Sequence, residues 1–191
     1  PNYLETRFNK SYPKKKGAFT YPPDLTDHAV YQDEFVWWVN NEFPESARHG
    51  ARIFYDLDNE PDLWSSTHSR IHPKPLTYAE LVERTYDYAS AIKAVDPDAV
   101  IFGFVSYGFN GFRTLQNAPD ANGRDFIDFF LDACRAMQAE AGKRLVDVLD
   151  LHWYPEARGG GHRISERNNS PETVRARVEA PRSLWDPTYV E

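Results

Sequence analysis

The sequence is poor in cysteine, with a single one among 191 residues. One thiol excludes an internal disulfide. Cys134 lies in the stretch "FIDFFLDACRAM", which predicts a helix, and no histidine lies near it. We therefore interpret it as a small buried hydrophobe rather than as a catalytic nucleophile.

The sequence also lacks a long apolar run, since none approaches the roughly 20 residues that a membrane-spanning helix needs. It shows no secretory signal and begins at Pro1 rather than Met. We expect either that the start was removed or that the chain is a piece of a longer polypeptide. A membrane is not among the predicted partners.

Positive charge is in the minority, with 22 Lys and Arg against 29 Asp and Glu and a net charge of -7. This balance argues against nucleic acid or an anionic membrane surface as the main partner. A neutral or cationic ligand is easier to accommodate.

Aromatic residues, by contrast, are abundant: they make up 15% of the chain, with 5 Trp, 11 Tyr and 12 Phe. Hydrophobic residues make up 41% and charged residues 27%, as in a soluble globular protein. The length suits one domain of ordinary size, which we place over residues 1–191. Rings with polar tips in such number also suit a ligand-binding surface.

The hydrophobic spacing predicts helices that alternate with short apolar strands. We expect residues 1–27 and 109–124 to form loops. The predicted helices cover residues 28–43, 78–95, 125–142 and 171–180, and the predicted strands cover residues 51–58, 99–108 and 145–155.

Two of the predicted helices carry capping signals. Thr77 and Glu80 are spaced as a capping box at the start of the second helix. Asp27 is the predicted cap of the first helix. The inner positions of that first helix are expected at Val30, Phe35, Val36, Val39 and Phe43.

Strands alternating with helices imply βα units and a parallel sheet, so the predicted fold class is α/β. Polar and aromatic residues follow each strand, at residues 58–60, 106–107 and 152–154. Ligands of parallel α/β folds bind at the carboxyl ends of the strands. A closed (β/α)8 barrel takes eight strands and at least about 200 residues. Because the sequence predicts fewer strands, we expect the middle part of a barrel.

The stretch "YDLDNEPDLWSSTH" delivers a carboxylate, Glu60, just after the first predicted strand. Burial at a strand end raises the pKa of a carboxyl group, and a protonated carboxyl can donate a proton near neutral pH. Asn59 offers donors and an acceptor for a substrate hydroxyl, and Pro61 fixes the exit of the loop. The alternative is an ordinary carboxylate on a surface loop.

Aromatic residues complete the predicted ligand cleft. His152 and Tyr154 alternate along the third strand and so share one face of it, and if that face points at the barrel mouth they converge with Glu60. The alternative is a half-buried aromatic strand end. Trp64 is either a stacking platform for the apolar face of a sugar ring or a loop anchor. Tyr107, at the end of the second strand, lines the same cleft.

Two groups of residues have side chains of the types that bind metal ions. His68 and His72 have the spacing of a zinc-binding pair, but no glutamate follows in zinc-protease fashion and Pro73 disfavours a helix there, so zinc hydrolysis is the weaker alternative. A structural calcium stays open, although acidic residues are common where helices begin. Its ligands would come from Asp24, Asp27, Asp33 and Glu34.

Three longer stretches, "YDLDNEPDLWSSTHSRIHP", "LDLHWYPEARGGG" and "APRSLWDPTY", resemble glycoside hydrolase family 44, the endoglucanases and xyloglucanases of the barrel clan A. The likeness runs through nearly the whole chain and includes "VSYGFNGF". It implies an α/β fold that is part of a (β/α)8 TIM barrel, about strands 4 to 6 with flanking helices. It also implies that the whole protein adds the rest of the barrel and a β-sandwich.

The resemblance implies a hydrolase that cleaves β-1,4-glucan of the cellulose or xyloglucan type within the polymer by a retaining double displacement. Glu60 maps to the acid/base in the family's Asn-Glu-Pro motif. Its partner nucleophile, about 5–5.5 Å away in a retaining pair, follows the seventh strand and lies outside this chain, so neither Glu156 nor Glu191 takes that role. The substrate-binding residues that we predict from the strand ends are Asn59, Trp64, Tyr107, His152 and Tyr154.

The implied partners are a β-glucan polysaccharide and the missing remainder of the barrel. No cofactor is required, and we expect the whole protein to be secreted. A second class of function stays open, namely a carbohydrate-binding relic or inactive fragment that keeps an aromatic groove without a nucleophile. A Thr-Glu-Tyr-like strand end in the remaining polypeptide would favour the enzyme, and its absence would favour binding alone.

Overall fold

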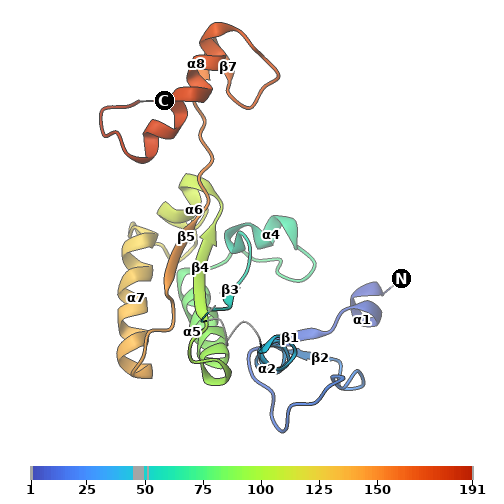
Figure 1. The fold of residues 1–191 in the computed structure, drawn as a ribbon. Helices are drawn as coiled ribbons and strands as arrows, with labels where there is room; N and C mark the ends of the chain where they lie inside the picture. The colour runs from blue at the N-terminus through green and yellow to red at the C-terminus, as the bar shows by residue number, and fades with distance from the viewer. Residues whose placement is uncertain (1, 45–49, 51, 191) are drawn as a thin grey trace. The chain divides into compact units, whose positions relative to one another are not determined.

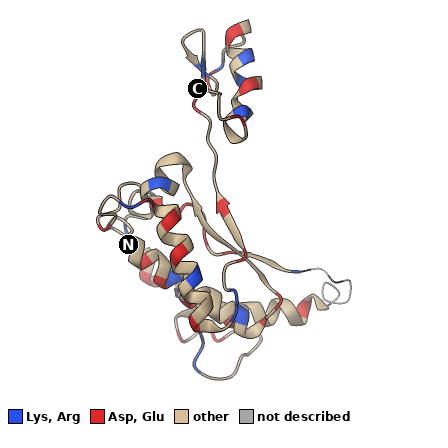
Figure 2. Cartoon of the chain, turned by 90° about the vertical axis from the view of Figure 1, so that its left-hand side faces the viewer, with Lys and Arg blue, Asp and Glu red and all other residues tan. Residues whose placement is uncertain are grey.

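The computed structural model describes residues 2–44, 50 and 52–190. The chain divides into two compact units, Pro1–His152 and Trp153–Glu191, and each is described by itself (Figure 1). Acidic and basic residues are interspersed along the chain in both units (Figure 2). No helix in the described ranges is long and apolar enough to cross a membrane. The predicted extent of the domain, residues 1–191, stays a prediction.

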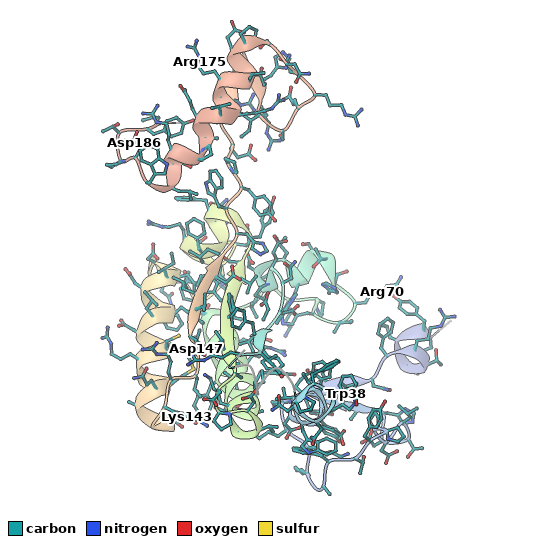
Figure 3. All side chains as sticks on the ribbon, in the orientation of Figure 1. Trp38, Arg70, Lys143, Asp147, Arg175 and Asp186 are labelled. Atoms are coloured by element: carbon teal, nitrogen blue, oxygen red, sulfur yellow. The ribbon has the colours of Figure 1, made fainter. Side chains whose placement is uncertain are left out.

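A three-stranded parallel sheet forms the centre of the first unit. Its strands β3 (Phe54–Asp56), β4 (Val100–Ser106) and β5 (Val148–Leu151) lie side by side in chain order. Helix α5 (Tyr78–Val95) connects β3 to β4 and helix α7 (Phe126–Ala141) connects β4 to β5; Lys143 and Asp147 mark the segment between α7 and β5 (Figure 3). Successive parallel strands joined by helices are βα units, so the predicted α/β class is confirmed.

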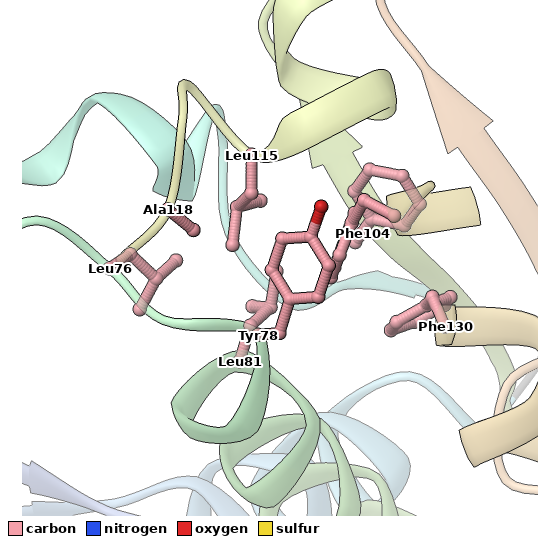
Figure 4. Close-up of a cluster of buried hydrophobic side chains, with 8 residues drawn as sticks. Leu76, Tyr78, Leu81, Phe104, Leu115, Ala118 and Phe130 are labelled. Carbon is pink, nitrogen blue, oxygen red and sulfur yellow. The ribbon is translucent and has the colours of Figure 1, made fainter. Parts of the chain in front are cut away.

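Strand β4 lies in the middle of the sheet and is almost wholly buried from Ile101 to Ser106. This burial, on an almost continuous apolar run, is typical of a strand that is covered on both faces of the sheet. Phe104 and Phe126 pack edge to face with ring centroids 4.6 Å apart, a pair worth about 0.5–1.5 kcal/mol beyond burial. They belong to a core cluster (Figure 4) completed by Leu76, Tyr78, Leu81, Leu115, Ala118 and Phe130.

The two long helices begin and end close to the predicted residues. Thr77 Oγ1 accepts a hydrogen bond from Glu80 N at 3.0 Å, which confirms the cap of α5. Gly142 follows α7 with φ 66, the left-handed geometry that glycine adopts without a steric penalty. The predicted capping box is only half formed, because the Glu80 carboxylate accepts hydrogen bonds from Arg84 and pairs with His72.

The segment before β3 differs from its prediction. Residues 1–27 contain α1 (Tyr3–Arg7) and β1 (Lys10–Tyr12) rather than a loop alone. The predicted helix over residues 28–43 is shorter and forms α2 (Gln32–Glu42), preceded by β2 (Ala29–Tyr31). Strands β1 and β2 pair in parallel, with Lys10 opposite Ala29. Pairing with a distant segment therefore replaces the first turn of the predicted helix.

Asp27 is not the cap of that helix, contrary to the prediction. Asp27 Oδ1 accepts a hydrogen bond from Ala29 N at 3.0 Å, in the turn that leads into β2. The predicted inner face is also largely wrong: Val36 is buried and Val39 is half-buried. The other predicted inner positions are exposed, namely Val30, Phe35 and Phe43.

Short helical turns replace parts of two predicted loops. Residues 109–124 include most of α6 (Gly108–Thr114), and Leu115 ends this helix with φ 48. The chain after Glu60 forms η1 (Pro61–Leu63) and α4 (Trp64–Thr67). Elements this short offer too few residues for hydrophobic periodicity to reveal them.

The third strand ends earlier than predicted. Strand β5 stops at Leu151, so His152 and Tyr154 do not share one face of a strand, contrary to the prediction. His152 N still donates a hydrogen bond to Ser106 O at 3.2 Å, which keeps His152 beside the end of β4. Tyr154 belongs to the second unit.

The second unit contains a short antiparallel hairpin, β6 (Arg158–Gly159) and β7 (His162–Arg163), followed by α8 (Pro171–Glu179) and η2 (Ala180–Leu184). Helix α8 confirms the helix predicted over residues 171–180. The hairpin packs on α8 at Gly159, where an added Cβ would lie 2.1 Å from the carbonyl oxygen of Glu172. Only glycine fits at that contact.

Candidate functional site

The carboxyl edge of the sheet brings together the segments that follow its three strands. Glu60 N donates a hydrogen bond to Val105 O at 2.9 Å, and His152 N donates one to Ser106 O at 3.2 Å. Two neighbouring carbonyl groups of β4 therefore hold the segment after β3 and the segment after β5. The βα architecture alone places Glu60 and His152 at one edge.

The side chains of Glu60 and His152 are in direct contact. Glu60 Oε1 lies 2.7 Å from His152 Nδ1, a short hydrogen bond. The two side chains keep 16% and 27% of their exposure, respectively, so the pair is largely withdrawn from water yet still accessible to a ligand. The structure thus unites two of the predicted site residues, while their roles stay predictions.

The backbone at Glu60 is unusual for a residue with a Cβ. Its angles, φ 51 and ψ 56, are left-handed, a conformation that costs an L-residue about 1–2 kcal/mol. This turn leads directly into η1, whose first residue is Pro61. The fixed φ of proline suits the first position of a helical turn. The Glu60 side chain is therefore placed by a defined reversal of the chain.

Other carboxylates surround this pair. Burial, followed by the charge of Asp150, raises the pKa of Asp56 on β3. Burial also raises the pKa of Asp62 on η1, and the charge of Glu60 adds to that effect. Like charges in a partly buried site favour a bound proton. The edge of the sheet is thus suited to a carboxyl group that carries a proton.

Asp62 connects the Glu60 segment to α6, a role that was not predicted from the sequence. Its side chain is buried, and its two oxygens accept hydrogen bonds from Tyr107 N at 3.0 Å and from Gln116 Nε2 at 3.2 Å. Gly111 lies so close that an added Cβ would sit 2.5 Å from Asp62 Oδ2. The available signal was an acidic residue inside the otherwise apolar run "PDLW".

Asn59 and Tyr107 lie at the same edge of the sheet. Asn59 is exposed, and its N–H donates to Asp58 Oδ1 at 2.7 Å. Tyr107 immediately precedes α6 and is 42% exposed. Both positions are accessible to a ligand at the Glu60 edge, and their predicted contacts with substrate stay predictions.

Trp64 has the surroundings of a loop anchor. It is partly buried against the core cluster that contains Tyr78 and Phe104. Its ring lies 5.4 Å from that of His72, and the Arg84 guanidinium lies 5.5 Å above it. These contacts fix α4 on α5. The role of Trp64 as a sugar-stacking platform stays a prediction.

Within the described residues, no three or more His, Cys, Asp or Glu side chains form a group that could hold a metal ion. His72 Nε2 lies 2.9 Å from Glu80 Oε1, and His68 Nδ1 lies 2.9 Å from Thr67 Oγ1, so the two histidines have different partners. The four carboxylates considered for calcium accept hydrogen bonds from the chain itself: Asp24 from Thr26, Asp27 from Ala29, Asp33 from Lys15, and Glu34 from Lys15 and Thr20.

Cys134 packs against both core clusters. Burial raises the pKa of its thiol to about 11. A thiol with this pKa stays protonated near neutral pH and is a poor nucleophile. The interpretation of Cys134 as a packing residue is therefore supported.

Tyr154 and Glu156 lie in the second unit, so the predicted place of Tyr154 beside Glu60 stays a prediction. Tyr154 is 51% exposed. The Glu156 carboxylate forms an ion pair with the Arg163 guanidinium in the β6–β7 hairpin. Glu191 lies outside the described residues.

Comparison with known proteins gives this site a context. Residues 4–157 match the model of Glycoside hydrolase family 44. Over 184 residues the chain is 48% identical to the Beta-mannanase/endoglucanase A of Caldicellulosiruptor saccharolyticus, an alignment that covers 92% of this chain and 14% of that protein. Over 191 residues it is 47% identical to the Endoglucanase A of Paenibacillus lautus, with 97% of this chain and 27% of that protein covered.

The fold is similar to that of a Paenibacillus polymyxa xyloglucanase of GH family 44, whose structure was solved with xyloglucan. The TM-score is 0.90 at 46% sequence identity, and the match covers 96% of this chain and 37% of the xyloglucanase chain. The chain thus spans a little over a third of that structure and a smaller share of the curated relatives. These shares agree with the predicted partial barrel.

Proposed function

Since this chain belongs to glycoside hydrolase family 44, we propose that the protein hydrolyses β-1,4-glucan of the cellulose or xyloglucan type at bonds within the polymer. The observation that carries the proposal is the position of Glu60. Its carboxyl group lies at the carboxyl edge of a parallel sheet, is largely buried and is hydrogen-bonded to His152. Catalytic groups of parallel α/β barrels occupy this edge.

The proposed mechanism is a retaining double displacement. In the first step Glu60, as a carboxylic acid, protonates the oxygen of the leaving sugar while a second carboxylate attacks the anomeric carbon and forms a glycosyl ester. In the second step Glu60, now a carboxylate, removes a proton from water, and the resulting attack on the anomeric carbon releases the second carboxylate. We assign that second carboxylate to the polypeptide outside this chain. No metal or cofactor enters this chemistry.

The substrate class is supported by relatives whose names include endoglucanase and xyloglucanase. We propose Asn59 and Tyr107 as contacts for sugar hydroxyls, because both lie beside Glu60 and are accessible. The polymer is too large to enter a cell, so we also propose that the whole protein is secreted.

Replacing Glu60 with Gln tests the proposed role of the acid. The full-length polypeptide is used, because the proposed nucleophile lies outside this chain. The expected loss in kcat on a natural glucan is roughly 10²–10⁴-fold, the usual contribution of a general acid. An aryl glucoside with a good leaving group needs less protonation, so its first step should lose less.

Glu166→Gln is the matched control, because Glu166 is also a carboxylate hydrogen-bonded to a histidine, His162, but lies in the second unit. It should retain wild-type turnover. Equal activity of Glu60→Gln and the wild type would refute the assignment. A wild-type protein that binds glucan without hydrolysing it would support the alternative of a carbohydrate-binding relic.

A further inference from the structure

We infer that His152 is a positioning residue that orients the Glu60 carboxyl group and shares a proton with it. The pair therefore keeps a proton available for the leaving sugar at a higher pH than Glu60 alone would. The inference rests on the proposed function, because it concerns the group proposed to protonate the leaving sugar. It deepens that proposal by giving His152 a role through Glu60 rather than through the substrate.

The geometry shows that this contact is built into the fold. His152 Nδ1 and Glu60 Oε1 are 2.7 Å apart. The backbone N–H groups of both residues are fixed on consecutive carbonyls of β4, those of Val105 and Ser106. Because each side chain starts from a fixed point at the same sheet edge, the hydrogen bond needs little ordering of flexible chain.

Several acidic groups lie in the neighbourhood of the pair. Strand β3 contributes Asp56, the segment after it Asp58, η1 contributes Asp62 and β5 contributes Asp150. Burial and the charge of Asp150 raise the pKa of Asp56, and the nearby His152 opposes a part of that rise; burial raises the pKa of Asp62, and the charge of Glu60 adds to it. Negative neighbours favour retention of a proton by the pair over its loss to solvent.

A carboxyl group and an imidazole in contact titrate as one unit. In the middle of their pH range the unit holds one proton, either on Glu60 beside a neutral imidazole or on His152 beside a carboxylate. The first of these forms is the proposed acid, and a shift of the proton along the hydrogen bond interconverts the two. Either form delays loss of the last proton, so that loss occurs at a higher pH than for an isolated Glu60 carboxyl group.

The decisive experiment is the pH profile of kcat/KM for the full-length polypeptide on a natural glucan, with His152→Asn and His152→Ala. Asparagine places an amide near the position of Nδ1 but cannot titrate, whereas alanine removes both the hydrogen bond and the titration. We expect the alkaline limb to move to lower pH by about 1–2 units in both variants, because the last proton is then lost from a carboxyl group alone, and free carboxyl groups titrate about that far below free imidazoles. We expect kcat at the optimum to fall further in the alanine variant.

His162→Asn is the matched control. Like His152, His162 is hydrogen-bonded through Nδ1 to a carboxylate, in this case that of Glu166 at 2.9 Å, but this pair is in the second unit. The control should leave the alkaline limb unchanged. A limb that stays in place in both His152 variants would overturn the inference, as would a limb that moves equally in the control.

A second measurement does not depend on activity. The pKa of the His152 imidazole is measured by NMR in the wild-type protein and in Glu60→Gln. Since a neutral amide cannot stabilise an imidazolium, the pKa should be lower in the variant. Equal values would overturn the inference. If the shift is present while the wild type fails to hydrolyse any glucan, the proton-sharing pair stands and the proposed function fails.

Discussion

At the residue scale, the contact between Asp62 and Gly111 determines how the Glu60 segment is held. Asp62 lies two residues after Glu60, and its oxygens accept hydrogen bonds from the start and from beyond the end of α6. The missing side chain of Gly111 leaves the space that the Asp62 carboxylate occupies. A buried carboxylate with satisfied hydrogen bonds is costly to displace. Asp62 therefore links the position of Glu60 to the packing of α6.

Gly111→Ala should disturb this link. The added methyl group would lie 2.5 Å from Asp62 Oδ2 and 2.9 Å from Ser106 Cβ, so Asp62 or α6 must move. We expect a loss of stability of about 1–3 kcal/mol, as for other overpacked sites, and a lower kcat through displacement of the Glu60 segment. Urea unfolding and glucan hydrolysis by the full-length polypeptide measure the two effects.

Asn110→Ala provides the control for that experiment, because Asn110 neighbours Gly111 on α6 and is exposed. A surface substitution of this kind usually changes stability by less than about 0.5 kcal/mol. If both alanine variants behave alike, the proposed coupling between Asp62 and Gly111 is wrong.

At the element scale, a largely buried ion pair joins α5 to the sheet. Lys93 Nζ donates to Asp147 Oδ2 at 2.8 Å and to Ala99 O at 2.6 Å. Asp147 Oδ2 also accepts a hydrogen bond from Ile101 N at 2.9 Å. The Lys93 side chain is 7% exposed and the Asp147 side chain 21%. Lys93 thus connects the end of α5 by hydrogen bonds to the residue before β4 and to the residue before β5.

Lys93→Met should be strongly destabilising. Methionine keeps most of the apolar stem but leaves the Asp147 carboxylate and the Ala99 carbonyl without this donor. Removing one partner of a buried pair costs about 3 kcal/mol or more. Urea unfolding of the full-length polypeptide measures the change.

Arg135→Met on α7 is the comparison for Lys93→Met. Arg135 pairs with Asp132 at 3.4 Å, but both side chains are highly exposed, at 83% and 74%. Exposed pairs contribute about 0–1 kcal/mol. Similar losses for the two methionine variants would contradict the importance assigned to the buried pair.

The helices and strands also show which signals in the sequence are sufficient to predict an element. Helices α5 and α7 were predicted closely because they are long and have local stop signals, and Thr77 also caps α5. Strand β2 was missed because its residues read as helix by local spacing, whereas pairing with β1, 19 residues earlier by the register of Lys10 and Ala29, decides their structure. Helix α6 was missed because Gly108 and Gly111 favour a loop unless tertiary contacts compensate.

The same distinction holds for the candidate site. Glu60 could be singled out as a candidate because a carboxylate just after an apolar strand is a local pattern, and its catalytic role stays a prediction. His152 was placed near it by the logic of parallel strands, although the assumed strand alternation was wrong. Asp62 could not be found in this way, since its role depends on contacts with Tyr107 and Gln116, about 50 residues away.

At the scale of the whole molecule, the described sheet is open. Strand β3 pairs with β4 and strand β5 pairs with β4, and neither outer edge carries a further strand among the described residues. Phe54 on β3 is 64% exposed and Leu149 on β5 is 40% exposed. A cavity of about 780 Å³ adjoins β3, with Tyr55, Leu57 and Phe104 in its lining. Open edges beside apolar surface favour association with further chain.

We therefore expect residues 1–191, expressed alone, to be catalytically silent and poorly stable or self-associating. The chain spans 37% of the related xyloglucanase structure, and our proposed mechanism places the nucleophile outside it. Without that second carboxylate Glu60 can offer a proton, but no group attacks the anomeric carbon. Size-exclusion chromatography measures association, and hydrolysis of carboxymethylcellulose and xyloglucan measures activity. Robust activity that disappears in Glu156→Gln would contradict the prediction and make Glu156 the nucleophile, despite its ion pair with Arg163.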